Sequence, residues 1–315
     1  MNPTGGACFV VGPDDAGARV DKLVAEHLGV SRSRVQIESV TVDGHEARVS
    51  DRPGPGAEIS VTIICETDTH LVGDAVGFDI VYADVDLVVV DKPAGVSVHP
   101  PATDLGRPSL IGALIGEFPE IAELSTPDTA ERPGVVHRID RGTSGLLVVA
   151  RSQTAFDGLQ RQVRGRRFDR HYAALVSGHF ETATGTIDAA LARRAGKRTF
   201  EVDPEGRHAT THYEVVAGWE RPEISLVDAR LETGRTHQIR VHMQAIGHPI
   251  VGDKAYRGRM ILGAQRQFLH ARHLGFEHPV TGARVECDAA LPADLREVLE
   301  AAGVPESGGV PQTWH

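Results

Sequence analysis

Short apolar runs, bounded by glycine, proline and charged residues, recur along most of this 315-residue chain. Runs such as LVVVDK (87–92) and GLLVVARS (145–152) have the length and the valine content of buried β-strands. The stretches AFDGLQRQVRGR (155–166) and THQIRVHMQAIG (236–247) place apolar residues at helical spacing instead. Because strands and helices do not alternate strictly, this pattern predicts an α+β fold.

The beginning of the chain has the features of a separate, small α/β module. RVDKLVAEHLGVSRSRVQ (19–36) predicts two helices, the second of which begins at Ser31. Asp43 and Gly44 form a typical hairpin turn, and GAEISVTI (56–63) predicts a closing strand. After a linker, a larger domain follows, and the glycine- and proline-rich end of the chain predicts an unstructured segment. We therefore predict a small module, a large domain and a flexible tail at 1–70, 78–300 and 301–315.

Charge is distributed unevenly along the chain. The formal net charge is −10, which is unfavourable for binding phosphate groups. The segment 138–170 nevertheless holds eight arginines against three aspartates, and 235–272 holds seven basic residues against Asp253 alone. Basic patches on an acidic body are compatible with RNA binding, although solvated charged faces would give the same pattern.

Cysteine usage and hydropathy exclude several other classes of protein. Cys8, Cys65 and Cys287 stand far apart and form no CxxC pair, which argues against a disulfide framework and a cysteine-based zinc site. No apolar run approaches the roughly 20 residues of a membrane span, and the N-terminus lacks the features of a secretory signal. We expect a cytoplasmic protein that makes no membrane contact and acts as a monomer.

Asp140 stands in the most informative stretch, HRIDRGTSGLLVVAR (137–151). Arg138 and Arg141 flank it, and flanking cations favour the ionised carboxylate. The small residues that follow allow a ligand to approach the backbone closely. By itself, this arrangement is typical of an ion-paired structural aspartate as well as of a catalytic one.

The same stretch resembles the signature of the large-subunit ribosomal RNA pseudouridine synthases, in which leucine stands in the place of Ile139. Four further segments are similar to motifs of that family, and all five follow the family's order and cover roughly 78–290. The four are VVVDKPAGVSVHP (88–100), RHYAALVSG (170–178), ARLETGRTHQIRVHMQAIGHPIVGDKAY (229–256) and FLHARHLGFEHPVTG (268–282). The resemblance implies a catalytic domain built on a mixed, mostly antiparallel sheet, preceded by a small N-terminal module.

The resemblance also implies an activity and a role for individual residues. Enzymes of this family isomerise uridine to pseudouridine in structured RNA after flipping the base, and the reaction needs no cofactor because no electrons or groups leave. Asp140 would be the catalytic aspartate, Tyr172 would lie against the flipped base, and Arg240 would pair with Asp140, which we expect to be a bidentate pair. Arg138 would fill the space left in the RNA, and Ile239 would form part of an apolar floor. Further substrate contacts are expected from Thr143, Arg235 and His237.

The first segment resembles the small RNA-binding module of a ribosomal small-subunit protein. In that module two helices carry the RNA-binding surface, which here implies Arg19, Lys22, Arg32 and Arg34. The stretch SRSRVQIESVTVDG (31–44) is several residues shorter than its counterpart, and acidic residues surround it. We therefore expect this module to bind RNA weakly.

Other kinds of site are less well supported, and we expect no metal. His237 and His242 are five residues apart, about 140° around a helix, so they do not converge on an ion. Aspartic proteases need two Asp-Thr/Ser-Gly copies, and the chain has no glycine-rich nucleotide motif after a strand. Large-subunit ribosomal RNA is the implied substrate, with transfer RNA as an alternative. A non-catalytic RNA-binding protein and an RNA N-glycosidase, which would release uracil, also stay open.

Overall fold

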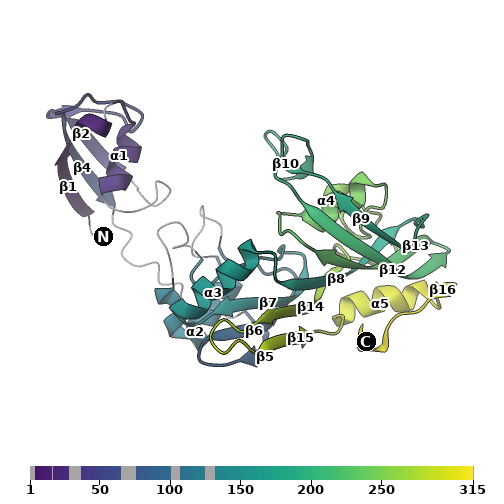
Figure 1. The fold of residues 1–315 in the computed structure, drawn as a ribbon. Helices are drawn as coiled ribbons and strands as arrows, with labels where there is room; N and C mark the ends of the chain where they lie inside the picture. Colours follow the sequence, from purple (N-terminus) through teal and green to yellow (C-terminus); the bar gives the residue numbers. More distant parts are fainter. Residues whose placement is uncertain are drawn as a thin grey trace. The chain divides into compact units, whose positions relative to one another are not determined.

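The computed structural model describes residues 4–15, 17–27, 37–64, 76–100, 107–124 and 132–314. They form two compact units, one built mainly on residues 4–64 and one mainly on residues from 76 onward (Figure 1). The helix predicted from Ser31, which carries Arg32 and Arg34, lies outside the described residues, as does most of the predicted linker. None of the helices in the described ranges is long and apolar enough to cross a membrane.

The N-terminal unit is an antiparallel sheet of order β1-β4-β2-β3 with one helix packed on it. Its elements are β1 (Thr4–Val10), η1 (Pro13–Asp15), α1 (Val20–His27), β2 (Ile37–Val42), β3 (His45–Glu46) and β4 (Glu58–Ile64). Asp43 and Gly44 have φ values of 51° and 77°, as a two-residue hairpin turn with both φ angles positive requires. The predicted hairpin is therefore confirmed. α1 buries Val20, Leu23 and Val24 against the strands.

The larger unit is built around one ten-stranded sheet of order β16-β12-β13-β8-β14-β7-β6-β5, with β15 paired to β14 and β9 to β12. Among the described strands of this sheet, the pair β7–β14 is parallel and the other pairs are antiparallel. The predicted mixed, mostly antiparallel sheet is thus confirmed. Its strands are β5 (Asp79–Ala83), β6 (Leu87–Lys92), β7 (Ser144–Ala150), β8 (Asp169–Ser177), β9 (Thr184–Asp188), β12 (Thr210–Glu220), β13 (Glu223–Leu231), β14 (Leu269–Glu277), β15 (Arg284–Asp288) and β16 (Ser307–Gly308).

Helices cover parts of this sheet, and a separate hairpin is formed by β10 (Leu191–Arg193) and β11 (Phe200–Val202). The helical elements are α2 (Leu110–Glu117), η3 (Pro119–Glu123), α3 (Gln153–Arg164), α4 (Gln238–Ala245), η4 (Lys254–Tyr256), α5 (Ala293–Ala302) and η5 (Gln312–Trp314). α3 begins after Ser152, whose hydroxyl accepts the N–H of Ala155 at 3.2 Å. Two arginines in its last turn stabilise the helix, because their positive charge lies at the negative end of the helix dipole. α4 lies against β11 and β12, where Figure 1 shows it beside β9.

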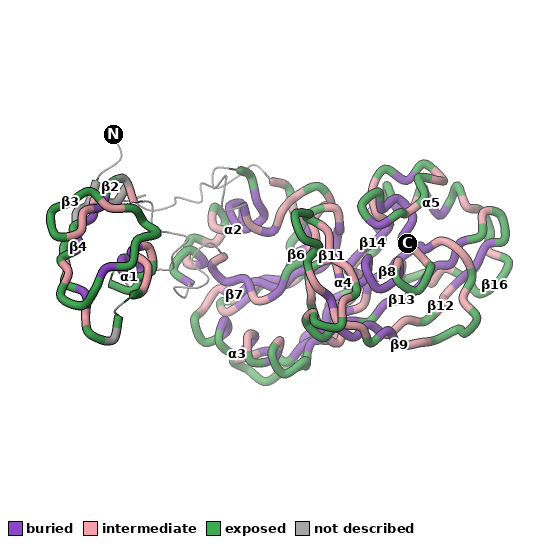
Figure 2. The backbone as a smooth tube through the Cα atoms, turned by 90° about the horizontal axis from the view of Figure 1, so that it is seen from above, coloured by how far each residue is buried: buried purple, intermediate pink, exposed green. Residues whose placement is uncertain are grey.

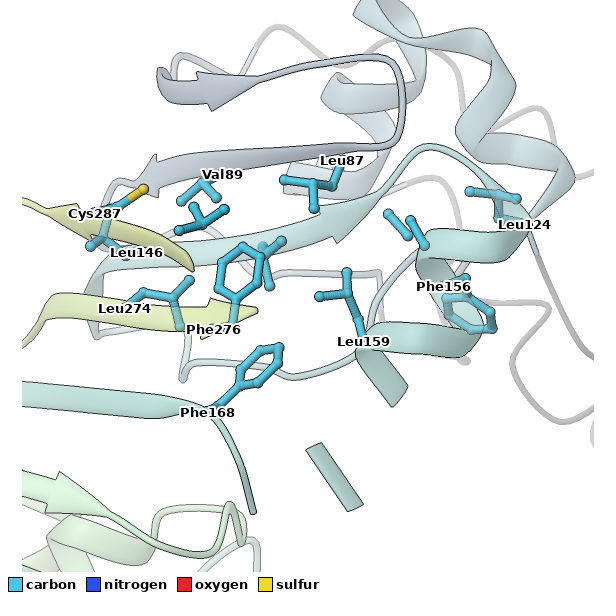
Figure 3. Close-up of a cluster of buried hydrophobic side chains, with 14 residues drawn as sticks. Leu87, Val89, Leu124, Leu146, Phe156, Leu159, Phe168, Leu274, Phe276 and Cys287 are labelled. Atoms are coloured by element: carbon cyan, nitrogen blue, oxygen red, sulfur yellow. The ribbon is translucent and has the colours of Figure 1, made fainter. Parts of the chain in front are cut away.

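The main core of the larger unit lies between α3 and strands β6, β7, β14 and β15. Figure 3 shows Leu159 of α3 close to Phe276 and Phe168, whose rings stack with their centroids 5.3 Å apart. Every residue of β7 is buried, as the apolar run predicted, and Figure 2 shows this buried path continuing into β8 and β13. The loop before β7 is therefore attached to a strand that is buried along its whole length.

The end of the chain packs on the larger unit. β16 pairs with β12, and Glu306 N–H donates to the carbonyl oxygen of Gly218 at 2.9 Å. Trp314 is 4% exposed, and the Cζ atom of Arg272 lies 4.8 Å from the centroid of its ring. The carbonyl oxygen of Trp314 accepts the N–H of Leu291. The prediction of a flexible tail over 301–315 is wrong, because the burial of one large aromatic ring outweighs the glycine and proline content.

Candidate active site

Asp140 lies in a tight loop that leads into β7. A hydrogen bond from Thr143 N–H to the carbonyl oxygen of Asp140, 3.0 Å long, closes the loop. At Gly145 the backbone has a φ of +115°, and a Cβ there would overlap the carbonyl oxygen of Ala271. The glycine-rich motif therefore allows the loop to lie directly against the beginning of β14.

Arg266 holds this loop from the β14 side. Its Nη1 donates to the carbonyl oxygen of Gly142 and its Nη2 donates to Ser144 Oγ, both at 3.1 Å. The same guanidinium pairs with Asp294 in the first turn of α5, with 2.7 Å between Nε and Oδ2. One side chain thus connects α5 to the loop that carries Asp140.

Lys92 holds the loop from another direction. It is fully buried, and its Nζ donates to two carbonyl oxygens of the turn after β6, at 2.7 and 3.0 Å, and approaches the carbonyl oxygen of Arg141 at 3.5 Å. Burial, followed by the charge of Arg266, lowers the pKa of Lys92 to about 7, while the charge of Asp140 opposes this shift. The loop is consequently fixed by long side chains of two distant segments.

Arg240 connects the Asp140 carboxylate to a second, more deeply buried carboxylate. Its Nη1 donates to Asp140 Oδ2 at 2.9 Å, while Nε and Nη2 donate to the two oxygens of Asp253 at 2.6 and 2.9 Å. Burial lowers the pKa of Arg240, but the bond to Asp253 and the charge of Asp140 outweigh it and raise the pKa overall. The expected Arg240–Asp140 contact is present, but the expected bidentate geometry is wrong, because Asp253 occupies the other edge of the guanidinium.

An open cleft with about 410 Å³ of space is lined by Asp140 and by apolar side chains. Tyr172 on β8 and Ile239 on α4 contribute to it and are 6% and 3% exposed. Burial raises the pKa of Tyr172 to about 12, so its phenol is neutral at physiological pH. Polar and charged residues that also line the cleft are Arg138, Thr143, Arg170, Arg235, His237, Gln238 and Arg240.

His237 adds a neutral, polarised group beside the carboxylate. It stands before α4 in a left-handed conformation, with a φ of 58°, and its Nε2 is 3.9 Å from Asp140 Oδ2. Tyr256 Oη accepts the N–H of Phe200 at 2.8 Å and lies 2.7 Å from His237 Nδ1, so the tyrosine proton is available to Nδ1. When the tyrosine donates to Nδ1, the histidine proton is on Nε2, which faces Asp140. Burial lowers the pKa of His237 and favours this neutral form.

This geometry occurs within a segment that matches a known family. The family model described as RNA pseudouridylate synthase matches residues 86–245. An RNA pseudouridine synthase of Chloroflexus aurantiacus is 44% identical over 300 residues, which cover 92% of each chain. The chain belongs to the RNA pseudouridylate synthase family. As a member of it, the protein is an isomerase that converts uridine to pseudouridine in RNA.

Two further members of the pseudouridylate synthase family extend the comparison. Ribosomal large subunit pseudouridine synthase D of Vibrio vulnificus is 39% identical over 307 residues, which cover 90% of each chain. Among solved structures, human RNA pseudouridylate synthase domain containing 1 has a TM-score of 0.57 and 28% identity, over 75% of this chain and 91% of that one. The likeness to these pseudouridylate synthases extends well beyond the motifs themselves.

The residues expected from the family resemblance meet at one cleft, except those of the N-terminal module. Arg138 is exposed on the cleft lining, with its Nη1 3.4 Å from His99 Nε2. Arg235 is partly exposed, and its Nε donates to the carbonyl oxygen of His208 at 3.0 Å. Thr143 is buried. The placement agrees with the expectation for each residue, while the roles in the synthase reaction stay predictions.

The basic residues expected to bind RNA through the N-terminal module lie on a different unit from the cleft. Arg19 precedes α1 and pairs with Asp21 at 3.0 Å, and Lys22 pairs with Glu26 one helical turn further at 3.4 Å. Both basic side chains are exposed, at 40% and 54%. Their contact with RNA stays a prediction.

Two residues that sequence reasoning did not single out support or line the synthase cleft. Asp253 takes two of the hydrogen bonds of Arg240, and its signal in the sequence was its position as the single acidic residue within 235–272. Arg170 lines the cleft two residues before Tyr172 on β8. The sequence could have indicated Arg170, because it stands two residues before Tyr172 in RHYAALVSG (170–178) and alternate residues of a strand share one face of the sheet.

One group in the described part of the chain brings metal-binding atoms together, and it consists of Asp84, Asp86 and His278. Its atoms already have partners within the protein. His278 Nδ1 accepts the N–H groups of Val280 and Thr281, at 3.3 and 3.1 Å, so its proton is on Nε2, 2.9 Å from Asp84 Oδ2. The group therefore links the β5–β6 turn to the end of β14.

Proposed function

We propose that this synthase modifies large-subunit ribosomal RNA and that Asp140 is the carboxylate that acts on the ribose. The substrate rests on relatives such as the Vibrio vulnificus enzyme, whose name refers to the large ribosomal subunit and which is 39% identical. The observation that carries the catalytic role is the 2.9 Å contact between Asp140 Oδ2 and Arg240, beside Tyr172 and Ile239 in one cleft. This contact holds the carboxylate next to an apolar surface.

The reaction requires a carboxylate that keeps its charge and its orientation. The bond between ribose C1′ and N1 of the uracil ring must break, and the ring must turn and rejoin through C5. Asp140 can support the first step by bonding to C1′ or by accepting a ribose proton. Both roles need a carboxylate held in one orientation, and Arg240 Nη1 donates to it at 2.9 Å.

Access to the target base requires that the nucleotide leave its stack, which costs a few kcal/mol. Tyr172 offers a neutral aromatic surface for the flipped base, and Arg138, which is exposed, is able to enter the vacated space in the RNA. Ile239 and the ring of Tyr172 exclude water from the detached ring. Exclusion of water favours rejoining over hydrolysis.

The remaining assignments concern the setting of the reaction. The N-terminal module, over residues 1–70, is proposed to add RNA contacts through α1, which begins next to Arg19 and carries Lys22. We place the enzyme in the cytoplasm, where ribosomal RNA is accessible, and assign it as a monomer. Sedimentation of the purified chain, alone and with RNA, checks the assigned oligomeric state.

The decisive experiment maps pseudouridine by carbodiimide chemistry in total RNA from a deletion strain. The strain is complemented with the parent gene or with the Asp140→Asn variant. We expect one or more sites in large-subunit ribosomal RNA to disappear on deletion, to return with the parent and to stay absent with the variant.

Other results of the same map contradict particular parts of the assignment. Loss of sites in transfer RNA alone would overturn the substrate, and an unchanged map with the purified enzyme inactive on ribosomal RNA would overturn the substrate and the site together. Free uracil released from RNA by the purified protein would identify an N-glycosidase instead. Pseudouridine formed by Asp140→Asn at the parent rate would remove Asp140 from the mechanism.

A further inference from the structure

Arg170 is a buried cation in the wall of the cleft. It is 6% exposed and lies beside Tyr172. Within the described ranges, its hydrogen bonding is limited to a contact of 3.5 Å from Nη2 to the carbonyl oxygen of Glu232, and its buried Nε has no acceptor. Burial lowers the pKa of Arg170. A buried guanidinium in this state is unfavourable unless a ligand supplies an accepting or negatively charged group.

Two other arginines that contact Asp140 or its loop, Arg240 and Arg266, are compensated within the protein by carboxylates. Arg240 pairs with two carboxylates, and Arg266 pairs with Asp294. Arg170 differs, because no carboxylate in the described part of the chain lies at ion-pairing distance from it. Its unused donors therefore point to a bound partner and not to a structural pair.

The backbone directs this side chain into the cleft. Arg170 and Tyr172 project from the same face of β8, because alternate residues of a strand share a face. Gly234 leaves the space that the guanidinium occupies, since a Cβ there would lie 2.8 Å from Arg170 Nη1. The cation thus lies next to the aromatic ring that is expected to hold the base.

We propose that Arg170 binds the uracil ring of the flipped nucleotide through a carbonyl oxygen and stabilises the negative charge that the ring carries while it is detached from the ribose. This inference rests on the proposed function, because the isomerisation of uridine places a detached uracil in this cleft. Arg170 is then a catalytic residue that acts on the leaving group.

The charge balance of the reaction explains why a second cation is needed. When the C1′–N1 bond breaks, its electron pair stays with the ring, which becomes an anion delocalised over N1 and the two carbonyl oxygens. Asp140 loses its charge in the same step, by bonding to C1′ or by accepting the C2′ proton. When C5 bonds to C1′, the carboxylate is restored, either because its bond to C1′ breaks or because its proton returns to C2′. The C5 proton then passes to water, and N1 gains a proton from water. A cation beside the ring stabilises the intermediate more than bound uridine.

The depth of Arg170 favours the base over a backbone phosphate. A phosphate stays linked to the RNA on both sides, so it meets exposed side chains, and the cleft lining offers Arg138 and the partly exposed Arg235 for it. Only the flipped base reaches a side chain that is 6% exposed. Phosphate binding by Arg170 is nevertheless one of the results that the experiment can return.

The experiment uses two RNAs that differ at the target position, which carries uridine or 5-fluorouridine. Fluorine withdraws electron density and gives a more stable ring anion, so cleavage of the C1′–N1 bond of 5-fluorouridine depends less on a stabilising cation. The full chain, Arg170→Met, Arg170→Lys and the control Arg230→Met react with each RNA in single turnover. Arg230 is exposed and pairs across β13 and β8 with His171, so it projects from the face opposite to the cleft. The target nucleoside is measured by chromatography after nuclease digestion.

We expect Arg170→Met to lower the rate on uridine RNA by about 100-fold, as for the loss of one preorganised donor, and to lower the rate on 5-fluorouridine RNA by a clearly smaller factor. Arg170→Lys keeps the charge, so its rate should fall less on both RNAs. The rates of Arg230→Met should match those of the parent. The melting temperature of Arg170→Met should not fall, because an uncompensated buried cation is replaced by an apolar chain of similar length.

Three results would overturn the inference while the parent still makes pseudouridine. These are an equal loss of rate on both RNAs, a loss confined to RNA affinity, which indicates a phosphate contact, and parent-like rates in Arg170→Met. If Arg170→Met does not fold, Arg170 has a structural role. The catalytic role is then tested with Arg170→Lys, by comparing its loss of rate on uridine RNA with its loss of rate on 5-fluorouridine RNA. A parent enzyme that forms no pseudouridine would instead refute the proposed function.

Discussion

Basic side chains are held in opposite ways in the two units. In the N-terminal unit, Lys22 pairs with Glu26 one turn further along α1, and both side chains are more than half exposed. In the larger unit, Arg240 pairs with Asp140, which lies 100 residues away in the sequence, and with Asp253, and 8% of the arginine side chain is exposed. A local surface pair contributes about 0.3–0.5 kcal/mol and exchanges its partners easily. A buried, long-range pair fixes a geometry. The difference agrees with the proposed division of roles, in which the N-terminal unit binds RNA and the larger unit carries out the reaction.

The largest effect is expected when the charge of Asp140 is removed. Asp140→Asn keeps the volume of the side chain and should lower the rate of pseudouridine formation by about 10⁴-fold, as for the loss of a catalytic carboxylate. Because the Arg240–Asp253 pair remains, the melting temperature should stay close to that of the parent. Tritium release from RNA labelled at uridine C5, measured beside thermal unfolding, checks both statements. A large fall in stability with normal turnover would show that Asp140 is a structural residue and not a catalytic one.

Breaking the deeper pair should affect stability as well as activity. Asp253→Asn leaves Arg240 without its buried partner and should lower the free energy of unfolding by about 3–5 kcal/mol, together with a loss of turnover because Arg240 no longer holds Asp140. The matched change in the other unit is Glu26→Gln, which should cost no more than about 0.5 kcal/mol. Urea unfolding of the two variants makes the comparison. Equal effects would show that burial is not what distinguishes the pairs.

Acidification should destabilise the larger unit through its buried histidines. Burial, followed by the charge of Arg170, lowers the pKa of His137 from 6.5 to about 3. Between these values the unfolded chain binds a proton that the folded chain does not, so the free energy of unfolding falls as the pH falls through 6.5 towards 3. In His137→Gln this dependence should be shallower by up to about 1.4 kcal/mol per pH unit. Unfolding curves from pH 7.5 to 4.5 measure it, with the exposed His45→Gln as control, and an unchanged slope would contradict the expected protonation.

The smallest effect is expected from the N-terminal unit. Replacing Arg19 and Lys22 together by alanine should weaken RNA binding a few-fold at low salt and reduce the salt dependence of the affinity by about one to two units of slope. Turnover at saturating RNA should not change, because neither residue lines the cleft. Filter binding over a range of salt concentrations tests this expectation. A loss of turnover without a loss of affinity would contradict this expectation, because it would show that the N-terminal unit affects the reaction itself.

The sequence was sufficient where chemistry and local pattern coincide. Asp140 and Tyr172 belong to contiguous motifs, and β7 and the Asp43-Gly44 turn follow from local hydrophobicity and turn preference. Partners that are set by the tertiary fold were not predictable in this way. Asp253 competes with Asp140 for Arg240 only because α4 and the turn before η4 lie side by side, and Arg266 reaches the Asp140 loop only because β14 runs parallel to β7. The error at the end of the chain has the same origin, since one buried tryptophan is a tertiary contact.

The connection that Arg266 makes between α5 and the Asp140 loop has a consequence for the order of events during synthesis. Asp294 is translated long after Asp140, so a growing chain can form β7 and its loop before the residue that anchors Arg266 exists. We expect such a chain to have a folded but inaccurate active site, and to acquire activity only when α5 has left the ribosome. Ribosome-bound chains stalled before and after α5, assayed for pseudouridine formation, would differ in activity if this is correct. If the substrate is ribosomal RNA, as proposed, this order of events would keep the enzyme from acting on the ribosome that is making it.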